Sequence, residues 1–164
     1  MPRLVPCLIL LLALLAPPAL AQDVRVTFGQ SLRLDGSALE VTADSLTVDQ
    51  TTGASEFSGN VLAVQGGMRI SAASLRLEYD RSAQSGGQRI ERVIASGGVL
   101  MATPDEAIEA REAVYSLSAQ TLEMTGSVML VQGANMLSGE AFFAALRNGT
   151  GSMQGRVRTV IQLD

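Results

Sequence analysis

Hydrophobic and polar side chains alternate along most of the chain from residue 23 onward. In the segment 75–79, two leucines and a tyrosine occupy every second position, with arginine and glutamate between them. A period of two is typical of a β-strand with one buried face. Turn sequences such as Gln65-Gly66-Gly67 and the segment 50–53 separate runs of this kind. The pattern predicts an all-β protein without substantial helix, apart from one helical turn suggested at residues 105–107.

A Gly-x-Val motif recurs at Gly59, Gly97, Gly126 and Gly155, at intervals of 38, 29 and 29 residues. The first interval is nine residues longer, and the polar run 81–89 would supply a loop of that length. We expect glycine at these strand starts because the backbone bends sharply there or takes a positive φ. Small residues keep the same spacing and indicate close approach between neighbouring layers: Ala43, Ala72, Ala110 and Gly139. A repeat of about 29 residues, with two strands and two turns per unit, predicts a stack in which each unit covers the next.

Residues 1–21 have the layout of a secretory signal peptide. Arg3 provides the basic start, the segment 8–15 is the short apolar core, and Ala19-Leu20-Ala21 forms a cleavage site before Gln22. The apolar run is too short for a membrane span, which needs about 20 residues. We therefore predict export, cleavage near Ala21-Gln22, and a single mature domain over residues 22–164.

The composition argues against several functions. The chain has no His and no Lys, and its one Cys, Cys7, lies in the predicted leader. The mature chain therefore offers no thiol nucleophile, no disulfide and no thiolate metal site, and it lacks histidine, the commonest general base and zinc ligand. Its carboxylates are scattered over turns and outward faces, and its serines have no histidine partner, so we predict no enzymatic activity, no metal and no cofactor. The net charge is −4, or −5 without Arg3, which argues against nucleic acid, because nucleic-acid binding relies on basic contacts to phosphate.

One face of the predicted strands is apolar along the whole chain. The mature chain has six methionines, and aromatic residues make up only 4% of the sequence. These features leave open whether the face closes on itself as a sandwich core or receives an apolar ligand, because methionine adapts to varied partners but also fills gaps in a core. The inward-facing candidates are Phe28, Leu34, Val48, Phe57, Val61, Met68, Ile70, Leu75, Leu77, Tyr79, Met101, Ile108, Tyr115, Leu117, Met124, Val128, Leu130, Leu137, Phe142 and Leu146.

Five segments of the mature chain follow one another in a recognisable order. They are Val41-Thr-Ala-Asp-Ser-Leu-Thr-Val48, Phe57-Ser-Gly-Asn-Val-Leu-Ala-Val-Gln-Gly66, Met68-Arg-Ile-Ser-Ala-Ala-Ser-Leu75, a second copy at 122–133, and a strand-like ending at 156–161. In this order, and with the leader and the total length, they resemble the OstA-like family of LptA-type lipopolysaccharide transport proteins. The resemblance covers nearly the whole mature chain and implies a twisted, partly open β-jellyroll of stacked antiparallel strands.

The resemblance also implies a function. It suggests a periplasmic bridge protein that carries lipopolysaccharide from the inner to the outer membrane, with the inward-facing residues shielding its acyl chains in an apolar groove. It implies head-to-tail self-association and joints to an LptC-like protein at the inner membrane and an LptD-like protein at the outer membrane. Strand addition at open sheet edges would form such joints, and the edge candidates are Val24, Val26, Val157, Thr159 and Ile161.

Two other hypotheses remain open at this point. The first is a structural β-repeat scaffold of the cell envelope, with a filled core and no lipid ligand. The second is a glycan-active β-helix enzyme, although we find no groove of basic or paired acidic residues to support it. The lipid hypothesis requires an apolar channel between the layers, whereas the scaffold hypothesis requires a solid interior.

Overall fold

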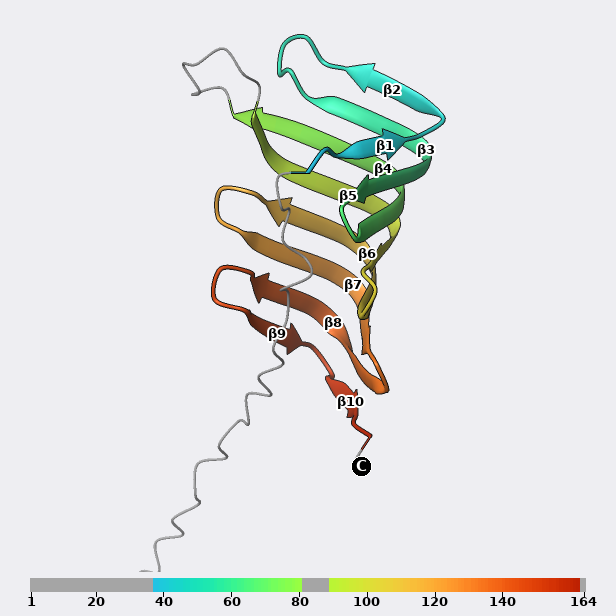
Figure 1. The fold of residues 1–164 in the computed structure, drawn as a ribbon, viewed down its shortest axis with the longest axis vertical. Helices are drawn as coiled ribbons and strands as arrows, with labels where there is room; N and C mark the ends of the chain where they lie inside the picture. The colour runs from blue at the N-terminus through green and yellow to red at the C-terminus, as the bar shows by residue number, and fades with distance from the viewer. Residues whose placement is uncertain (1–36, 81–88, 163–164) are drawn as a thin grey trace, which may run out of the picture.

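The computed structural model describes residues 37–80 and 89–162, and in these residues all regular structure is β-strand. The strands form one antiparallel sheet that rises as a stack from β1 and β2 at one end to β9 and β10 at the other (Figure 1). From β3 to β8 each strand pairs with its neighbours in sequence, as expected for a stack of hairpins, while β1 and β2 both pair with β3, and β9 and β10 both pair with β8. The strands are β1 (Glu40–Thr42), β2 (Ser45–Val48), β3 (Ser55–Gln65), β4 (Met68–Asp80), β5 (Arg89–Ala102), β6 (Glu106–Ser116), β7 (Thr121–Gln132), β8 (Asn135–Ala145), β9 (Thr150–Gln154) and β10 (Arg158–Val160).

The long strands bend near their middle, and the Gly-x-Val glycines lie at the bends. Their φ angles are 79°, 83°, 85° and 74° for Gly59, Gly97, Gly126 and Gly155. The register between neighbouring strands shifts at the same level, as at the β3–β4, β5–β6 and β7–β8 pairings. The prediction of positive φ is therefore confirmed. The predicted position at a strand start is wrong, because three of the glycines lie inside β3, β5 and β7 and the fourth lies between β9 and β10.

Close approach between neighbouring strands explains why these positions are glycine. A Cβ built on Gly97 would lie 2.5 Å from the Cβ of Ala73, and one built on Gly126 would lie 2.6 Å from the Cβ of Arg111. Apolar carbons prefer separations of about 3.5–4.0 Å. Each bend therefore packs closely against the strand that precedes it in the stack. The contacted residues, Ala73 and Arg111, each follow one of the predicted small positions, Ala72 and Ala110, which are themselves buried.

The bend divides the sheet into two leaves whose inner faces meet. Leaf A comprises residues 45–48, 55–58, 74–80, 89–96, 112–116, 121–125, 141–145 and 150–154, and leaf B comprises residues 40–42, 61–65, 68–72, 99–102, 106–110, 128–132, 135–139 and 158–160. Buried side chains of both leaves form one core cluster, in which Leu75 and Phe142 of leaf A join Ile108 and Leu130 of leaf B. The all-β prediction is thus confirmed, with the core lying inside the fold of the sheet.

Both end rungs of the stack are split into two short strands. β1 and β2 pair with the two halves of β3, and β10 and β9 pair with the two halves of β8. Residues 43–44 interrupt the first rung, and residues 155–157 interrupt the last. The stack therefore has continuous strands in its middle and divided rungs at both ends.

Two predicted turns are confirmed, and the helical turn is wrong. β3 and β4 are joined at Gly66-Gly67, and the turn after β2 is closed by a hydrogen bond from Gly53 N to Asp49 O at 2.6 Å. Residues 105–107 form no helix: Thr103 N donates to Glu106 O at 2.8 Å, and β6 begins at Glu106. The tight hairpin between β5 and β6 leaves no room for a helical turn before the strand.

Several predictions fall outside the described residues. They concern the signal peptide and its cleavage site, and most of the predicted loop at 81–89, of which only Arg89 is described, as the first residue of β5. Within the described residues, no helix is long and apolar enough to cross a membrane.

Candidate functional site

The inner faces of the two leaves carry continuous apolar rows that run across the stack. Residues directly opposite each other in antiparallel strands share a face, so the register defines these rows. One row of leaf A consists of Leu46, Phe57, Leu75, Ala95, Ala113, Met124, Phe142 and Met153. One row of leaf B consists of Val41, Ala63, Ile70, Met101, Ile108, Leu130 and Leu137. The space between these rows is the candidate site, which we call the slot.

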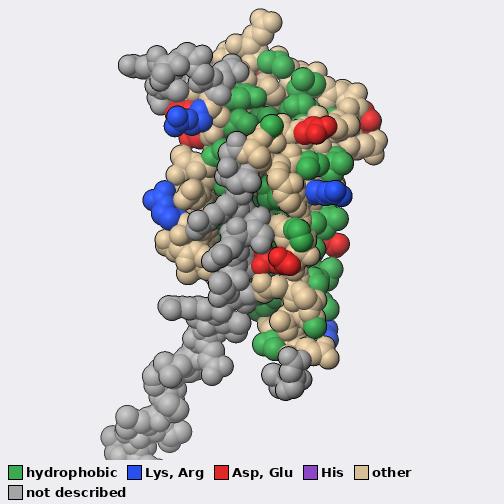
Figure 2. Space-filling model, in the orientation of Figure 1, with side chains coloured by type: hydrophobic (Ala, Val, Ile, Leu, Met, Phe, Trp, Pro, Cys, Tyr) green, Lys and Arg blue, Asp and Glu red, His purple; other side chains and the backbone are tan. Residues whose placement is uncertain are grey.

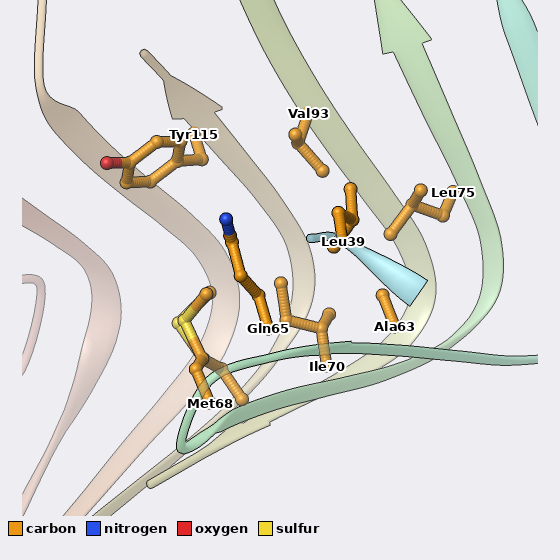
Figure 3. A pocket seen from close by; sticks show the side chains of 9 residues that line it. Leu39, Ala63, Gln65, Met68, Ile70, Leu75, Val93 and Tyr115 are labelled. Carbon is orange, nitrogen blue, oxygen red and sulfur yellow. The ribbon is translucent and has the colours of Figure 1, made fainter. Parts of the chain in front are cut away.

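The slot is narrow, and its own side chains fill much of it. Near β3 and β4 it holds an apolar cavity with a free volume of about 20 Å³, where a single water molecule needs roughly 10–15 Å³ by this measure. Figure 3 shows Gln65, Met68 and Ile70 of leaf B facing Leu75, Val93 and Tyr115 of leaf A across this cavity. Farther along the stack, Phe142, Leu122 and Ile108 are almost fully buried. At the level of this cavity, the described side chains leave room for about one water molecule but not for an acyl chain.

Most of the predicted inward-facing residues lie on the slot faces. Buried are Val61, Met68, Ile70, Leu75, Leu77, Met101, Ile108, Tyr115, Met124, Val128, Leu130, Leu137, Phe142 and Leu146. Phe57, Tyr79 and Leu117 are partly buried and pack against this core. Phe28 and Leu34 lie outside the described residues.

Val48 is the exception among the described candidates, because it is 55% exposed. Its register partner is Ser55, which pairs with the buried Leu77, so Val48 has the predicted face. It belongs to β2, however, which is an edge strand of leaf A. The side chain is exposed because the covering row ends there.

The sequence reasoning missed part of the leaf A face. Val93, Ala95 and Ala113 are buried there, at 7%, 2% and 4% exposure. Val93 and Ala95 occupy alternate positions, but the residue between them, Ile94, is apolar too, so the alternation is weak there. Alanine is a weak marker of a core position, and these strands follow the predicted loop, where the start of the alternation is hard to place.

The free end of leaf B carries a polar rim along the slot, which consists of Gln65, Glu106, Gln132 and Asn135. Gln132 Nε2 donates to Glu106 Oε1 at 2.7 Å, and Gln65 Nε2 donates to the backbone oxygen of Ser37 at 2.7 Å. Burial raises the pKa of the Glu106 carboxyl; the Gln132 hydrogen bond opposes this shift, and the nearby Asp105 charge adds to it. The slot is thus apolar inside and polar along one edge.

The outer faces carry scattered charges. Arg76 lies 3.3 Å from Glu78 and 3.8 Å from Glu56, and Arg92 lies 3.2 Å from Glu78. These side chains are about a third to a half exposed, and such pairs contribute little to stability. On the face shown in Figure 2 the charged groups are dispersed among neutral and hydrophobic ones. Among the described residues, no group of His, Cys, Asp and Glu could hold a metal ion.

The C-terminal edge candidates lie at one end of the stack. β10 contains Thr159 and pairs only with β8 among the described strands. Val157 and Ile161 flank it and are 48% and 58% exposed. Val24 and Val26, predicted for the opposite edge, lie outside the described residues. Among the described strands, β1 and β2 form the first edge.

Comparison with known proteins agrees with this architecture. The chain is 28% identical over 160 residues to an uncharacterized protein of Rhizobium meliloti (strain 1021), which covers 93% of this chain and 84% of that protein. Its fold is similar to the crystal structure of LptH, the LptA homologous periplasmic component of the conserved lipopolysaccharide transport device from Pseudomonas aeruginosa. The TM-score is 0.68 at 18% sequence identity, over 78% of this chain and 97% of that one. The jellyroll-like stack of antiparallel strands expected from the sequence is therefore confirmed.

The family assignment comes from the sequence itself. Residues 40–149 match the model of the LptA/(LptD N-terminal domain) LPS transport protein family. This range begins at the first residue of β1 and ends in the turn before β9, so it includes most of both leaves. The chain belongs to the LptA/(LptD N-terminal domain) LPS transport protein family.

Proposed function

We propose that this protein is a periplasmic bridge component that carries lipopolysaccharide from the inner to the outer membrane, with the lipid's acyl chains held between leaf A and leaf B. The observation that carries the proposal is the pair of continuous apolar rows that face each other along the whole described stack. Membership of a lipopolysaccharide transport family supports the choice of ligand.

The free energy of transfer favours burial of acyl chains in such a slot. Removing a methylene from water contributes about 0.8 kcal/mol, so a twelve-carbon chain contributes roughly 10 kcal/mol. Part of this gain is used to separate side chains that already contact one another across the slot. Because apolar contact has no preferred direction, a chain can slide from one rung to the next without any covalent chemistry.

Head-to-tail assembly would extend the slot between the two membranes. Strands lie about 4.8 Å apart, so a stack of eight rungs spans only roughly 40 Å. The exposed edge at β10 and the edge formed by β1 and β2 offer unpaired backbone groups to a second copy, to an LptC-like protein or to an LptD-like protein. The edge residues Val157 and Ile161 would contact such a partner.

The close packing of the slot favours one other function. A solid interior is what a structural scaffold of the cell envelope would need, and the cavity described near β3 and β4 is small. The two functions differ in whether the leaves open for lipid. They therefore make different predictions for buried positions on the inner faces.

Site-specific photo-crosslinking in Gram-negative cells tests the proposal. A photoreactive amino acid at Leu77 or Leu130, both buried on the slot faces, should crosslink to lipopolysaccharide. The adjacent outward positions Arg76 and Val131 are matched controls and should not. Folded variants that never crosslink from Leu77 or Leu130 would favour the scaffold. Depletion of the protein should also make lipopolysaccharide accumulate at the inner membrane.

A further inference from the structure

Within the described part of the chain, two buried side-chain oxygens lack a hydrogen-bond partner, and both belong to the polar rim. They are Gln65 Oε1 and Glu106 Oε2. A buried acceptor without a partner destabilises a fold, so native proteins keep few of them and each one calls for an explanation. Their position on the same edge of the slot points to a common cause.

A hydrogen bond from its nitrogen fixes the orientation of the Gln65 amide. Its Nε2 donates to the backbone oxygen of Ser37 at 2.7 Å, which sets the orientation of the amide and leaves Oε1 as the unsatisfied atom. Gln65 also lines the apolar cavity beside Met68 and Tyr115 (Figure 3). The Gln65 side chain therefore brings a buried acceptor to the lining of an apolar space.

Glu106 repeats this arrangement farther along the rim. Its Oε1 accepts from Gln132 Nε2 at 2.7 Å, and its Oε2 is the unsatisfied atom. Glu106 lies on β6 and Gln65 on β3, three strands apart, which corresponds to roughly 14 Å along the stack. Gln132, which orients Glu106, follows Gln65 by 67 residues and occupies the equivalent place in the sequence repeat.

We propose that the polar rim is a hydrogen-bond-accepting site for the sugar head of the bound lipid. The unsatisfied oxygens would accept from the hydroxyl and amide N–H groups of an acylated amino sugar, while its acyl chains occupy the slot. Phosphate groups would lie elsewhere, because phosphate oxygens are themselves acceptors and a carboxylate would repel them. This inference rests on the proposed function, since it assumes that the slot holds acyl chains.

The test compares lipids that differ in head group, and the two forms of lipid A also share the same acyl chains. The probes are diphosphoryl lipid A, the same lipid with both phosphates removed, and phosphatidylcholine, whose head has no N–H or O–H donor. Their dissociation constants are measured for the full-length mature protein, for Gln65→Leu, and for Gln154→Leu. Gln154 is an exposed glutamine on β9 and provides the matched control.

The inference predicts a selective loss of affinity. Gln65→Leu should weaken both forms of lipid A by about three- to tenfold, as expected for one hydrogen bond, and should leave phosphatidylcholine binding unchanged. Its thermal midpoint should change little, because the substitution removes the unsatisfied acceptor together with the hydrogen bond to Ser37; a merely structural role would weaken the binding of all lipids alike. Glu106→Gln, which places a donor where an acceptor was, should shift the preference toward the phosphorylated form.

The outcomes separate this inference from the proposed function. If every protein binds phosphatidylcholine and lipid A equally well, or if Gln65→Leu changes all lipids by the same factor, the rim is not a head-group site although the slot still holds lipid. If the wild-type protein binds none of the three lipids, the slot does not carry acyl chains, and both conclusions are overturned.

Discussion

The two neighbouring glycines at the β5 bend allow a prediction with a built-in control. Gly97 and Gly98 have φ angles of 83° and 87°, so alanine is strained at both positions. A Cβ on Gly98 meets no atom within 4 Å, whereas a Cβ on Gly97 lies 2.5 Å from Ala73 Cβ. The pair therefore separates the cost of the backbone conformation from the cost of close strand packing.

The expected magnitudes follow from these two terms. Alanine at a positive φ costs about 1–2 kcal/mol, and this is the whole expectation for Gly98→Ala. In Gly97→Ala the neighbouring strand must also move by about 1 Å to restore a normal carbon contact, and overpacking of this kind costs about 1–3 kcal/mol. The free energy of unfolding should therefore fall by about 2–5 kcal/mol, with a midpoint lowered by roughly 4 °C per kcal/mol.

Urea unfolding followed by far-ultraviolet circular dichroism provides the measurement. Both variants should retain the wild-type slope against urea, because the surface exposed on unfolding is unchanged. The loss of stability in Gly97→Ala should exceed that in Gly98→Ala by at least 1 kcal/mol. Equal losses in the two variants would refute the argument that strand nesting requires glycine at the bends.

Three further predictions concern the core, the polar rim and the sheet edge. Leu75 is fully buried, so Leu75→Ala should lower the free energy of unfolding by about 2–5 kcal/mol. Leu62 lies at an outer position with 40% exposure, so Leu62→Ala should lower it by less than about 1 kcal/mol. Similar losses in urea unfolding would contradict the assignment of the inner face. The pKa of Glu106 is raised in the folded protein, so the folded state binds this proton more readily than the unfolded chain, and ionisation removes stability as the pH rises. Glu106→Gln keeps the acceptor for Gln132 but cannot ionise. The thermal midpoint of this variant minus that of the wild type should therefore increase between about pH 4 and pH 7. A difference that stays constant with pH would count against this prediction. The double variant Val157→Lys/Ile161→Lys should stay folded but self-associate at least about tenfold more weakly in sedimentation experiments, because edge lysines oppose strand addition. The control Leu62→Lys should have little effect on self-association. Unchanged association of the double variant would place the joint elsewhere.

The fold could be predicted from the sequence because alternation and spacing are local signals. Gly59, Gly97 and Gly126 mark equivalent points of successive hairpins, and their spacing indicated a stack before any strand was paired. What spacing could not reveal is that these glycines lie in the middle of strands. A bend in a continuous strand and the start of a new strand both require an unusual backbone conformation, and only the pairing on both sides of the glycine distinguishes them.

The inner face could be predicted only in part, because the alternation changes phase at some bends. In β4 the buried positions are Met68 and Ile70 before the bend and Leu75 and Leu77 after it, so even-numbered positions give way to odd ones. The apolar side chains themselves showed this change. Coverage of these side chains by the opposing leaf depends on tertiary packing, which the alternation does not reveal. Val48 therefore lies on the predicted inner face of its strand but remains exposed.

The size of the slot and the polar rim were beyond sequence reasoning. The distance between the leaves depends on how side chains of both leaves interdigitate, which no single strand encodes. The rim residues Gln65 and Gln132 appeared in the sequence only as repeated neighbours of turn glycines. Their hydrogen bonds to Ser37 and Glu106 join positions that are 28 and 26 residues apart, and the unsatisfied oxygens become visible only when these contacts are known.

The divided rungs at the two ends of the stack have a consequence for how copies could exchange. β9 has five residues and β10 has three, and each is hydrogen-bonded only to β8 among the described strands. Either piece can detach while the other remains in place, so an arriving chain needs to displace only a few backbone hydrogen bonds at a time. If copies join head to tail as proposed, a neighbour would pair first with one leaf and then with the other, so the end rung would exchange in two steps and would never be released all at once.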